Sequence, residues 1–348
     1  MSPHAGVRRS LSWAAGAVAA GTALAACQPI SLSAAGGDST GPSAATAAIA
    51  PGLVTAPEQG YQPIYDFITS AHHTLDMTMY ELVDTTAEQD LVRDAERGVR
   101  VRVVLDHHLE KKNNQAAFRH LTEHGVHVAW ANTHYASTHQ KTITVDDSTS
   151  AIMTGNLTSR YYSTTRDLGV MDNTPADVTA IEQTFDADFA GMVATPPNGA
   201  DLVWSPTTAE PDMISLINSA RQSLQVENEE MGLSAVESAL IPAAHRGVDV
   251  RVTMTRSSDW TDASDKLVRG GVHVATYSSS ASLYIHAKVI VRDAGQPDAK
   301  AFVGSENFSS ASLTRNRELG LTLTAPAILT ALHDTLGHDY SAAAQWTA

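Results

Sequence analysis

SLYIHAKVIVRD, residues 282–293, has a histidine and a lysine two positions apart in an otherwise strand-like run. Strand side chains alternate between faces, so an extended segment from Leu283 to Arg292 would place His286 and Lys288 on one face. An unpaired buried lysine is costly, whereas a lysine beside an imidazole is suited to holding an anion near a reactive group. Taken alone, so short a pattern is better explained by an edge strand whose polar face meets water.

The pattern occurs a second time. STHQKTITVDD, residues 137–147, contains His139 and Lys141 at the same spacing. An aspartate follows each lysine by five positions, at Asp146 and Asp293. Seven residues separate each histidine from its aspartate, and this odd number turns the carboxylate to the other face of a straight strand. We therefore expect the aspartates to be structural partners at a strand-end turn.

The whole chain is an internal duplication. The segment at 68–82 matches 217–231, and ERGVRVRVVLD at 96–106 matches HRGVDVRVTMT at 245–255, both with an offset of 149. Each repeat alternates helix and strand in the order β-α-β-α-β-β, with a glycine stop after the second helix. The fold class predicted is α/β, with two tandem half-domains at 51–196 and 197–348. Each is a mixed sheet flanked by helices, and the two face each other about a pseudo-twofold axis.

The first 50 residues have the composition of an export signal and a tether. Arg8 and Arg9 precede an apolar, small-residue run that is too short for a membrane span, which predicts a signal peptide over 1–26. LAAC resembles the bacterial lipobox and predicts lipidation of Cys27, although such a run also arises by chance in an alanine-rich signal. Residues 27–50 are rich in Ser, Ala, Gly and Thr, as flexible linkers are. We expect an extracytoplasmic lipoprotein of the bacterial cell membrane, or a secreted protein.

Charge and cysteine content restrict the classes of function. The formal charge of the 348 residues is −15, and removing 1–26 takes away two arginines and no acid, which gives −15 − 2 = −17. Such a protein is poorly suited to grip nucleic acid through a basic surface. Cys27 is the only cysteine, so lipidation would leave neither a disulfide nor a thiol nucleophile.

Each repeat also carries a hydroxyl, an amide and a late carboxylate. AIMTGNLTSR at 151–160 aligns with AFVGSENFSS at 301–310, which pairs Thr154 with Ser305 and Asn156 with Asn307. TTRDLGV then aligns with RNRELGL, which pairs Asp167 with Glu318. Three further acids, Glu227, Glu229 and Glu230, are interpreted as a solvated strand end or a substrate rim.

The combination of H-x-K-x4-D, then G-S-x-N, then an acid before Leu-Gly resembles the phospholipase D superfamily. The resemblance covers both repeats, from about residue 50 to the C-terminus. It departs from the family pattern at Met153, where glycine is usual, and at Thr154, which replaces serine. Four additional residues lie between Asp293 and Gly304. None of these departures touches the groups expected to react.

The resemblance implies one shared site, although two independent sites stay possible. One histidine would attack phosphorus and the other would act as acid and base. His139 is the expected nucleophile and His286 the expected acid/base, an assignment that the pseudo-symmetry leaves open. Groups expected to bind the phosphoryl oxygens are Lys141, Lys288, Asn156 and Asn307, supported by Thr154 and Ser305.

Asp167 and Glu318 would each accept a hydrogen bond from Nδ1 of the histidine in their own repeat. The lysine and histidine pairs predict a positive site that needs no metal and no cofactor.

The implied function is a phospholipase D-type hydrolase that releases phosphatidic acid and a headgroup alcohol through a phosphohistidine. The expected partner is phospholipid at a membrane surface, with the protein a monomer anchored through Cys27. The alternatives are a metal-independent nuclease of the same superfamily, which the acidic composition disfavours, and a non-catalytic membrane-surface module. A lipid-building transferase uses the same intermediate but normally carries membrane spans, and none is evident in the sequence.

Overall fold

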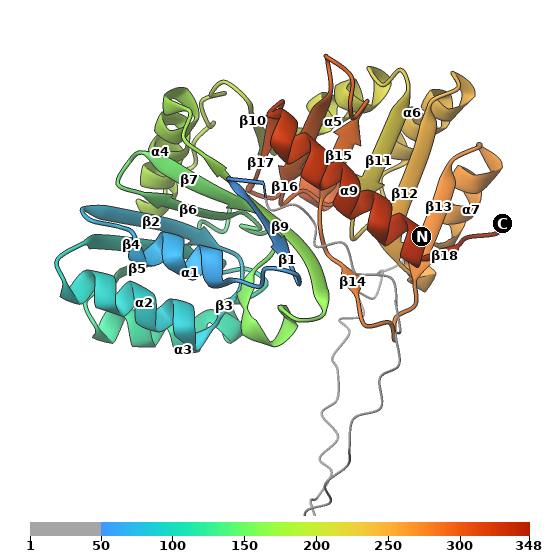
Figure 1. Ribbon diagram of the computed structural model, residues 1–348. Helices are drawn as coiled ribbons and strands as arrows, with labels where there is room; N and C mark the ends of the chain where they lie inside the picture. The colour runs from blue at the N-terminus through green and yellow to red at the C-terminus, as the bar shows by residue number, and fades with distance from the viewer. Residues whose placement is uncertain (1–49) are drawn as a thin grey trace, which may run out of the picture. The chain divides into compact units, whose positions relative to one another are not determined.

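A computed structural model describes residues 50–348. The predicted signal peptide, Cys27 and all but the last residue of the predicted linker lie outside the described residues. Figure 1 shows two sheets, one drawn blue to green and the other yellow to red, each flanked by helices. The predicted α/β fold of two tandem half-domains is confirmed. Within 50–348, no helix combines the length and apolarity that crossing a bilayer requires.

The first repeat builds a mixed sheet in the order β1-β9-β7-β6-β2-β4-β5. Its parallel part is β2-β4-β5, with α2 and α3 as the crossovers, and its remaining pairs are antiparallel. The elements are β1 Leu53–Ala56, α1 Gln62–Thr69, β2 Thr74–Met79, β3 Leu82–Val83, α2 Thr85–Glu96, β4 Arg100–Leu105, α3 Lys111–Glu123, β5 His127–Trp130, β6 Lys141–Val145, β7 Thr149–Met153, β8 Leu157–Thr158, β9 Thr165–Asp172 and α4 Pro175–Phe189.

The second repeat has the same topology, β10-β17-β16-β15-β11-β12-β13, with β18 added at its edge. Its elements are β10 Leu202–Ser205, α5 Ala209–Asn218, β11 Ser223–Glu227, α6 Ser234–His245, β12 Asp249–Thr255, α7 Thr261–Arg269, β13 His273–Tyr277, β14 Tyr284–Ile285, β15 Val289–Arg292, β16 Lys300–Gly304, α8 Ser310–Thr314, β17 Glu318–Leu323, α9 Pro326–Ala342 and β18 Ala344–Gln345. The predicted boundary between 196 and 197 falls between α4 and β10 and stays a prediction.

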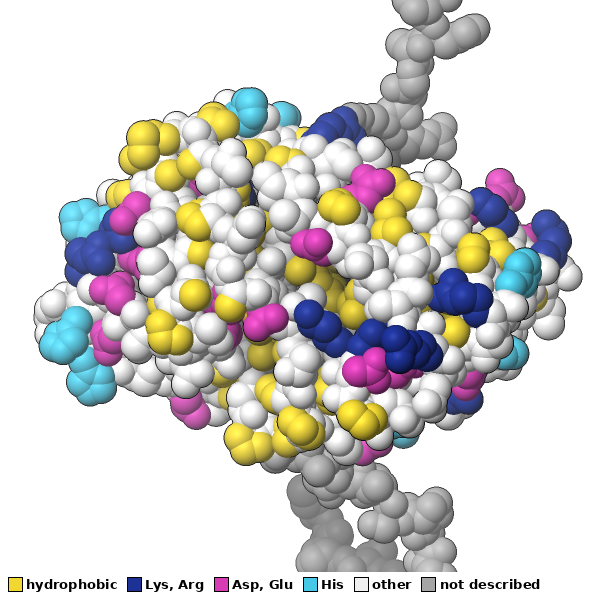
Figure 2. All heavy atoms as spheres, turned by 90° about the horizontal axis from the view of Figure 1, so that it is seen from above, with side chains coloured by type: hydrophobic (Ala, Val, Ile, Leu, Met, Phe, Trp, Pro, Cys, Tyr) yellow, Lys and Arg dark blue, Asp and Glu magenta, His cyan; other side chains and the backbone are white. Residues whose placement is uncertain are grey.

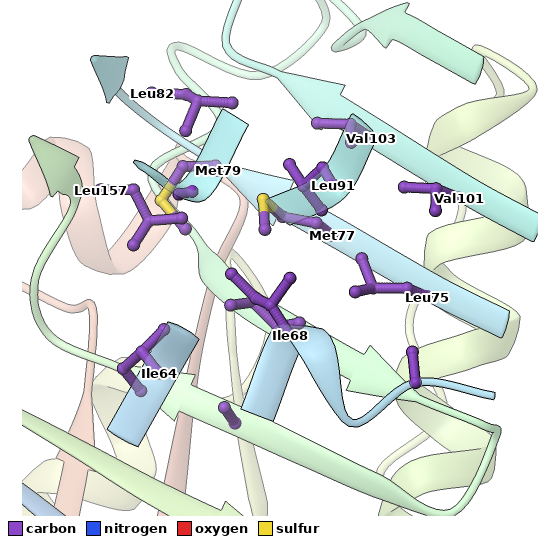
Figure 3. Close-up of a cluster of buried hydrophobic side chains, with 14 of the residues drawn as sticks. Ile64, Ile68, Leu75, Met77, Met79, Leu82, Leu91, Val101, Val103 and Leu157 are labelled. Carbon is purple, nitrogen blue, oxygen red and sulfur yellow. The ribbon is translucent and has the colours of Figure 1, made fainter. Parts of the chain in front are cut away.

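Three large apolar cores organise the described part of the chain, beside a smaller cluster of Val104, Ala131 and Phe185. One face of each sheet packs on its own helices. In the first repeat, Ile68 of α1 points toward Met77 of β2, and Ile64 and Leu91 belong to the same buried cluster (Figure 3). α5, α6 and α7 form the corresponding core on the second sheet. The third core contains residues of both repeats, among them Ile152, Leu168, Val289 and Leu319. Since burying apolar area drives association, this shared core holds the repeats against each other.

The two H-x-K runs differ from the predicted continuous strands. β6 begins at Lys141 and β15 at Val289, so each histidine lies just before a central strand. The residues preceding each histidine pair with the opposite repeat instead: β14 is parallel to β9, and Thr138 forms a matching bridge to Arg317. This exchange across the pseudo-twofold axis interrupts the strands and brings the two histidine segments to the boundary between the repeats.

Candidate active site

Each histidine is held by a carboxylate from the other repeat. Nδ1 of His139 lies 2.8 Å from Oε2 of Glu318, and Nδ1 of His286 lies 2.7 Å from Oδ1 of Asp167. Both imidazoles are largely buried, with 12% and 15% of their side-chain surface exposed. Because an ionised carboxylate only accepts, it fixes the proton on Nδ1 and leaves Nε2 available for chemistry.

The expectation that each carboxylate serves the histidine of its own repeat is therefore wrong. Asp167 is the third residue of β9 and Glu318 is the first residue of β17, and these two strands line the boundary between the repeats. His139 donates from its backbone N–H to the carbonyl of Arg317, next to Glu318, at 2.9 Å. His286 donates in the same way to the carbonyl of Arg166, next to Asp167, at 3.3 Å. The backbone exchange thus delivers each imidazole to the acid of its partner repeat.

The arginines preceding the two acids reinforce this crossing. Nε of Arg166 lies 2.5 Å from Oδ2 of Asp339 on α9 of the second repeat. Nε of Arg317 lies 3.0 Å from Oδ2 of Asp188 on α4 of the first repeat. All four side chains are at least nine-tenths buried, so these are desolvated ion pairs that connect the repeats in both directions. Separating either pair would leave a buried charge without its partner. The two pairs therefore favour one arrangement of the repeats over others.

The electrostatics of the two carboxylates follow from these contacts. Burial opposes ionisation of both, but His286, Lys288 and the Thr154 hydroxyl hold the pKa of Asp167 below its ordinary value. His139 and Lys141 do the same for the pKa of Glu318. Conversely, burial is the main cause of a lowered pKa at His139, with Lys141 adding to it and Glu318 opposing it. His139 therefore stays unprotonated to lower pH than a free imidazole.

The two predicted lysines are fully buried beside the histidines. Nζ of Lys141 donates to the carbonyl of His139 at 2.5 Å, and Lys288 donates to the carbonyl of His286. Lys141 also lies 5.0 Å above the ring of Tyr80. Burial, together with the charge of Lys288, lowers the pKa of Lys141 to about 7. The lysines are thus placed beside the reactive imidazoles, where phosphoryl oxygens would be bound.

The predicted amides and hydroxyls divide into two kinds. Oδ1 of Asn156 and Oδ1 of Asn307 are buried without a partner among the described residues, so both amides have unused capacity. The Thr154 hydroxyl donates to Oδ1 of Asp167 at 2.7 Å, as expected of a supporting group. The Ser305 hydroxyl bonds with the backbone of Leu319, and the Ser305 carbonyl lies 3.1 Å from Nδ1 of His139. Ser312 instead supplies the hydroxyl that donates to Glu318, at 2.5 Å. The sequence alignment missed Ser312 because it has moved onto α8.

The two aspartates of the repeated motif are structural, as expected. Asp146 accepts from the backbone N–H groups of His72, His73 and Thr74, and Asp293 accepts from those of residues 221–223. Both residues have left-handed backbone angles, φ 52° and 51°. Each therefore turns the chain after the central strand and ties it to the start of the neighbouring strand.

Glu229 lies in the site, which agrees with the substrate-rim alternative for the acidic run, although the sequence assigned it no contact with a reactive group. Its Oε2 lies 3.2 Å from Nζ of Lys288, 3.3 Å from Nδ2 of Asn307 and 3.5 Å from Nε2 of His286. The nearby Glu227 is fully buried, and burial followed by the charge of Asp339 raises its pKa well above the ordinary value. The interpretation of this acidic run as a solvated strand end is wrong, because Glu227 enters the core and Glu229 enters the site.

The predicted positive site is also wrong in its balance of charge. Asp167, Glu318 and Glu229 supply three carboxylates against the two ammonium groups of Lys141 and Lys288. Glu306 lies close by, and burial and the neighbouring Glu318 raise its pKa well above the ordinary value, which disfavours its charged form. Positive charge is therefore local to the lysines and is matched by acids within hydrogen-bonding reach.

Comparisons with known proteins agree with this geometry. The sequence matches the family described as "Cardiolipin synthase, PLD-like domain" twice, over residues 64–189 and 213–340. No curated protein matches the chain. Among solved structures, phosphatidylserine synthase of Haemophilus influenzae Rd KW20 superposes with a TM-score of 0.62 at 11% identity, over 85% of this chain and 87% of that one.

The polyphosphate kinase of Porphyromonas gingivalis superposes with a TM-score of 0.64 at 14% identity, over 82% of this chain. The match spans only 50% of the kinase, so this chain covers half the length of that relative. At these identities both likenesses show the fold alone.

Proposed function

The chain belongs to the family described as "Cardiolipin synthase, PLD-like domain", part of a superfamily that acts on phosphodiester bonds, and we propose that it hydrolyses the phosphodiester bond to the headgroup of a phospholipid. The products would be phosphatidic acid and the headgroup alcohol. The observation that carries the proposal is the pair of crossed dyads, His139 with Glu318 and His286 with Asp167. Two oriented imidazoles with a buried lysine beside each suit a two-step displacement at phosphorus.

In the first step, Nε2 of His139 attacks phosphorus while the bond from phosphorus to the headgroup oxygen breaks. The leaving oxygen takes the bonding electron pair and the Nε2 proton of His286. In the second step His286 removes a proton from water, the water oxygen attacks phosphorus, and the phosphorus–nitrogen bond breaks. Lys141, Lys288 and the two asparagine amides would bind the non-bridging oxygens as negative charge develops.

The environments of the two histidines support this division of roles. The lowered pKa of His139 favours the neutral imidazole that a nucleophile requires. Nε2 of His286 lies 3.5 Å from Oε2 of Glu229, so a hydrogen-bond acceptor faces the nitrogen from which the leaving oxygen would take its proton. A neutral His139 and a proton-bearing His286 form the starting state of the first step.

A nuclease activity is the competing proposal within the same superfamily. It would be favoured by a broad basic surface, since duplex and single-stranded nucleic acids are bound largely through phosphates. On the face seen in Figure 2, lysines and arginines of the described residues form a short row with acidic side chains beside it, and the rest of that face is mostly uncharged. The formal charge of −15 points the same way, so lipid is the preferred substrate.

The proposed setting is a membrane surface. We infer that lipidation of Cys27 anchors a monomer outside the cytoplasmic membrane, with residues 27–50 as the tether. Such an anchor would hold the site near its substrate and raise the effective concentration of lipid.

The function is tested with residues 28–348 and vesicles of mixed phospholipids in the presence of a chelator, followed by phosphorus NMR. We expect a phosphatidic acid signal from the wild type and none from His139→Ala. Adding glycerol as an acceptor tests transfer, since a phosphatidyl-glycerol signal in place of phosphatidic acid would make the enzyme a transferase. An unchanged spectrum with the wild type would contradict the lipid assignment, and cleavage of single-stranded DNA would then be measured.

A further inference from the structure

Glu229 breaks the pseudo-symmetry of the site. The offset of 149 that relates the strands before the site places Glu229 in the position of Tyr80. The Tyr80 ring lies 4.6 Å from the ring of His139 and 5.0 Å from Nζ of Lys141. Glu229 makes the corresponding contacts to His286 and Lys288. Equivalent positions of the two repeats therefore carry different side chains: an aromatic ring lies beside His139, and a carboxylate lies beside His286.

The carboxylate holds groups that a substrate phosphate also needs. Lys288 and Asn307 both donate to Oε2 of Glu229, at 3.2 and 3.3 Å. When a phosphodiester binds, these donors would turn to its oxygens, and Glu229 would lose the ammonium of Lys288, its nearest counter-charge, and keep the Tyr284 hydroxyl and the more distant Nε2 of His286. A desolvated carboxylate without a counter-charge is strongly unfavourable. The substrate that fits this site best therefore brings a cation together with its phosphate.

A zwitterionic diester exchanges one ion pair for two. The Lys288–Glu229 pair would be replaced by Lys288 with phosphate and by Glu229 with the cation. A diester with a neutral alcohol replaces it with a single pair and gives Glu229 no new counter-charge in place of Lys288. The cation of a zwitterion also offsets the negative charge that the phosphate brings into the site, whereas a diester of a neutral alcohol adds a net negative charge beside three carboxylates.

Tyr284 supplies the second feature of such a subsite. Its hydroxyl donates to Oε1 of Glu229 at 2.9 Å, and 41% of the residue is exposed. Glu229 itself keeps 23% of its side-chain surface exposed. An accessible aromatic ring next to a carboxylate is a common way to bind an ammonium or quaternary ammonium group. Both residues lie on the side of His286, the proposed donor of a proton to the leaving alcohol.

We propose that Glu229 and Tyr284 form a subsite for a positively charged group on the leaving alcohol, so that the enzyme selects zwitterionic phosphodiesters over those with neutral alcohols. This inference rests on the proposed function, because it assumes that a phosphodiester binds between the histidines with its leaving alcohol next to His286.

Binding is measured first, because it does not depend on turnover. The probes are methyl phosphocholine and methyl 3,3-dimethylbutyl phosphate, two diesters that differ only in nitrogen against carbon and hence in one charge. By calorimetric titration of His139→Ala, which cannot form the covalent intermediate, we expect the zwitterion to bind about tenfold more tightly, as one added ion pair allows. Equal affinities would overturn the proposal, whether or not the enzyme hydrolyses lipid.

The variants then assign the selectivity to the subsite. Glu229→Gln in the same background should reduce the preference to about threefold or less, in line with the loss of a charge-assisted contact. Glu230→Gln, which removes the neighbouring charge and keeps Glu229, should leave the preference unchanged. Tyr284→Leu, at a partly exposed position, should reduce it without unfolding the protein. A preference that survives both Glu229→Gln and Tyr284→Leu would contradict the assignment.

Turnover separates this inference from the proposed function. Phosphatidylcholine and its 3,3-dimethylbutanol analogue are compared in mixed micelles, with kcat/KM for each. Glu229→Gln should lower kcat/KM selectively for the choline lipid, and an equal loss on both would indicate a general catalytic role and overturn the proposal. If neither lipid is cleaved but the binding preference is present, the function fails and the subsite stands.

Discussion

At the scale of single residues, Lys141 is unusual because its pKa lies close to neutral pH, far below that of an ordinary lysine. It is fully buried, and burial together with Lys288 lowers its pKa to about 7. Glu318, Glu229 and Asp167 limit the shift. The charged form is the one that binds phosphoryl oxygens, so it is present below this pKa and lost above it.

The first prediction is a fall of kcat/KM as pH rises through about 7, the pKa of the free enzyme's Lys141. The fall in kcat should come at higher pH, since a bound phosphate raises the pKa of the lysine. Lys141→Arg keeps its charge at every accessible pH, so its descending limb should move up even if the rate drops. A descending limb that is the same in Lys141→Arg would show that another group titrates there.

At the scale of elements, Asp146 ends β6 and fastens it to the start of β2. Asp146 has a left-handed backbone conformation, which Asp and Asn adopt more readily than alanine does. Its carboxylate also accepts hydrogen bonds from three backbone N–H groups. Asp147 has a similar backbone, φ 49°, but accepts only a 3.3 Å bond from the Thr74 hydroxyl. Comparing Asp146 with Asp147 therefore separates the contribution of the hydrogen bonds to stability from that of the backbone conformation.

The second prediction is that Asp146→Ala lowers the free energy of unfolding by about 2 to 3 kcal/mol, from lost charge-assisted bonds and left-handed strain. Asp147→Ala should cost less than about 1 kcal/mol, since it loses one long bond. Urea titration followed by circular dichroism measures both. Equal costs would indicate that the turn conformation, and not the hydrogen bonds, determines stability here.

The secondary-structure elements are largely predictable from the sequence, whereas the contacts between the repeats are not. Periodicity and the 149-residue offset predict the helices, the central strands and the role of Asp146 and Asp293, because these depend on neighbours in the chain. They do not predict that His139 meets Glu318 in place of Asp167. That choice is made by docking between repeats, and strand parity within one repeat contains no information about it. The contacts of Glu229 were not predicted for a related reason: Lys288, Asn307 and His286 come together around it only when several elements of the second repeat pack.

At the scale of the whole molecule, two buried ion pairs bind the repeats in opposite directions. Arg317 of the second repeat meets Asp188 on α4, and Arg166 of the first meets Asp339 on α9. The carbonyl of each arginine also holds the backbone of the opposite histidine. Stability and the geometry of the site are thus coupled through the same residues.

The third prediction compares two aspartates on one helix. Asp188→Asn leaves Arg317 buried and without its counter-charge, which should cost about 3 to 5 kcal/mol and lower kcat. Asp186→Asn removes an ion pair between Arg102 and a carboxylate that is 62% exposed, and should cost less than about 1 kcal/mol. Urea midpoints and initial rates test both. Similar stability of the two variants would contradict the role assigned to the buried pair.

The crossing of the dyads has a consequence for how such a site can arise. A single repeat would hold a histidine without its carboxylate, so it could act only as a symmetric dimer, in which each copy completes the other. Dimers dissociate on dilution, whereas covalent linkage keeps the second repeat at a high effective concentration. Fusion also frees the two copies to differ, and the exchange of Tyr80 for Glu229 is a divergence that a symmetric pair could not make on one side alone.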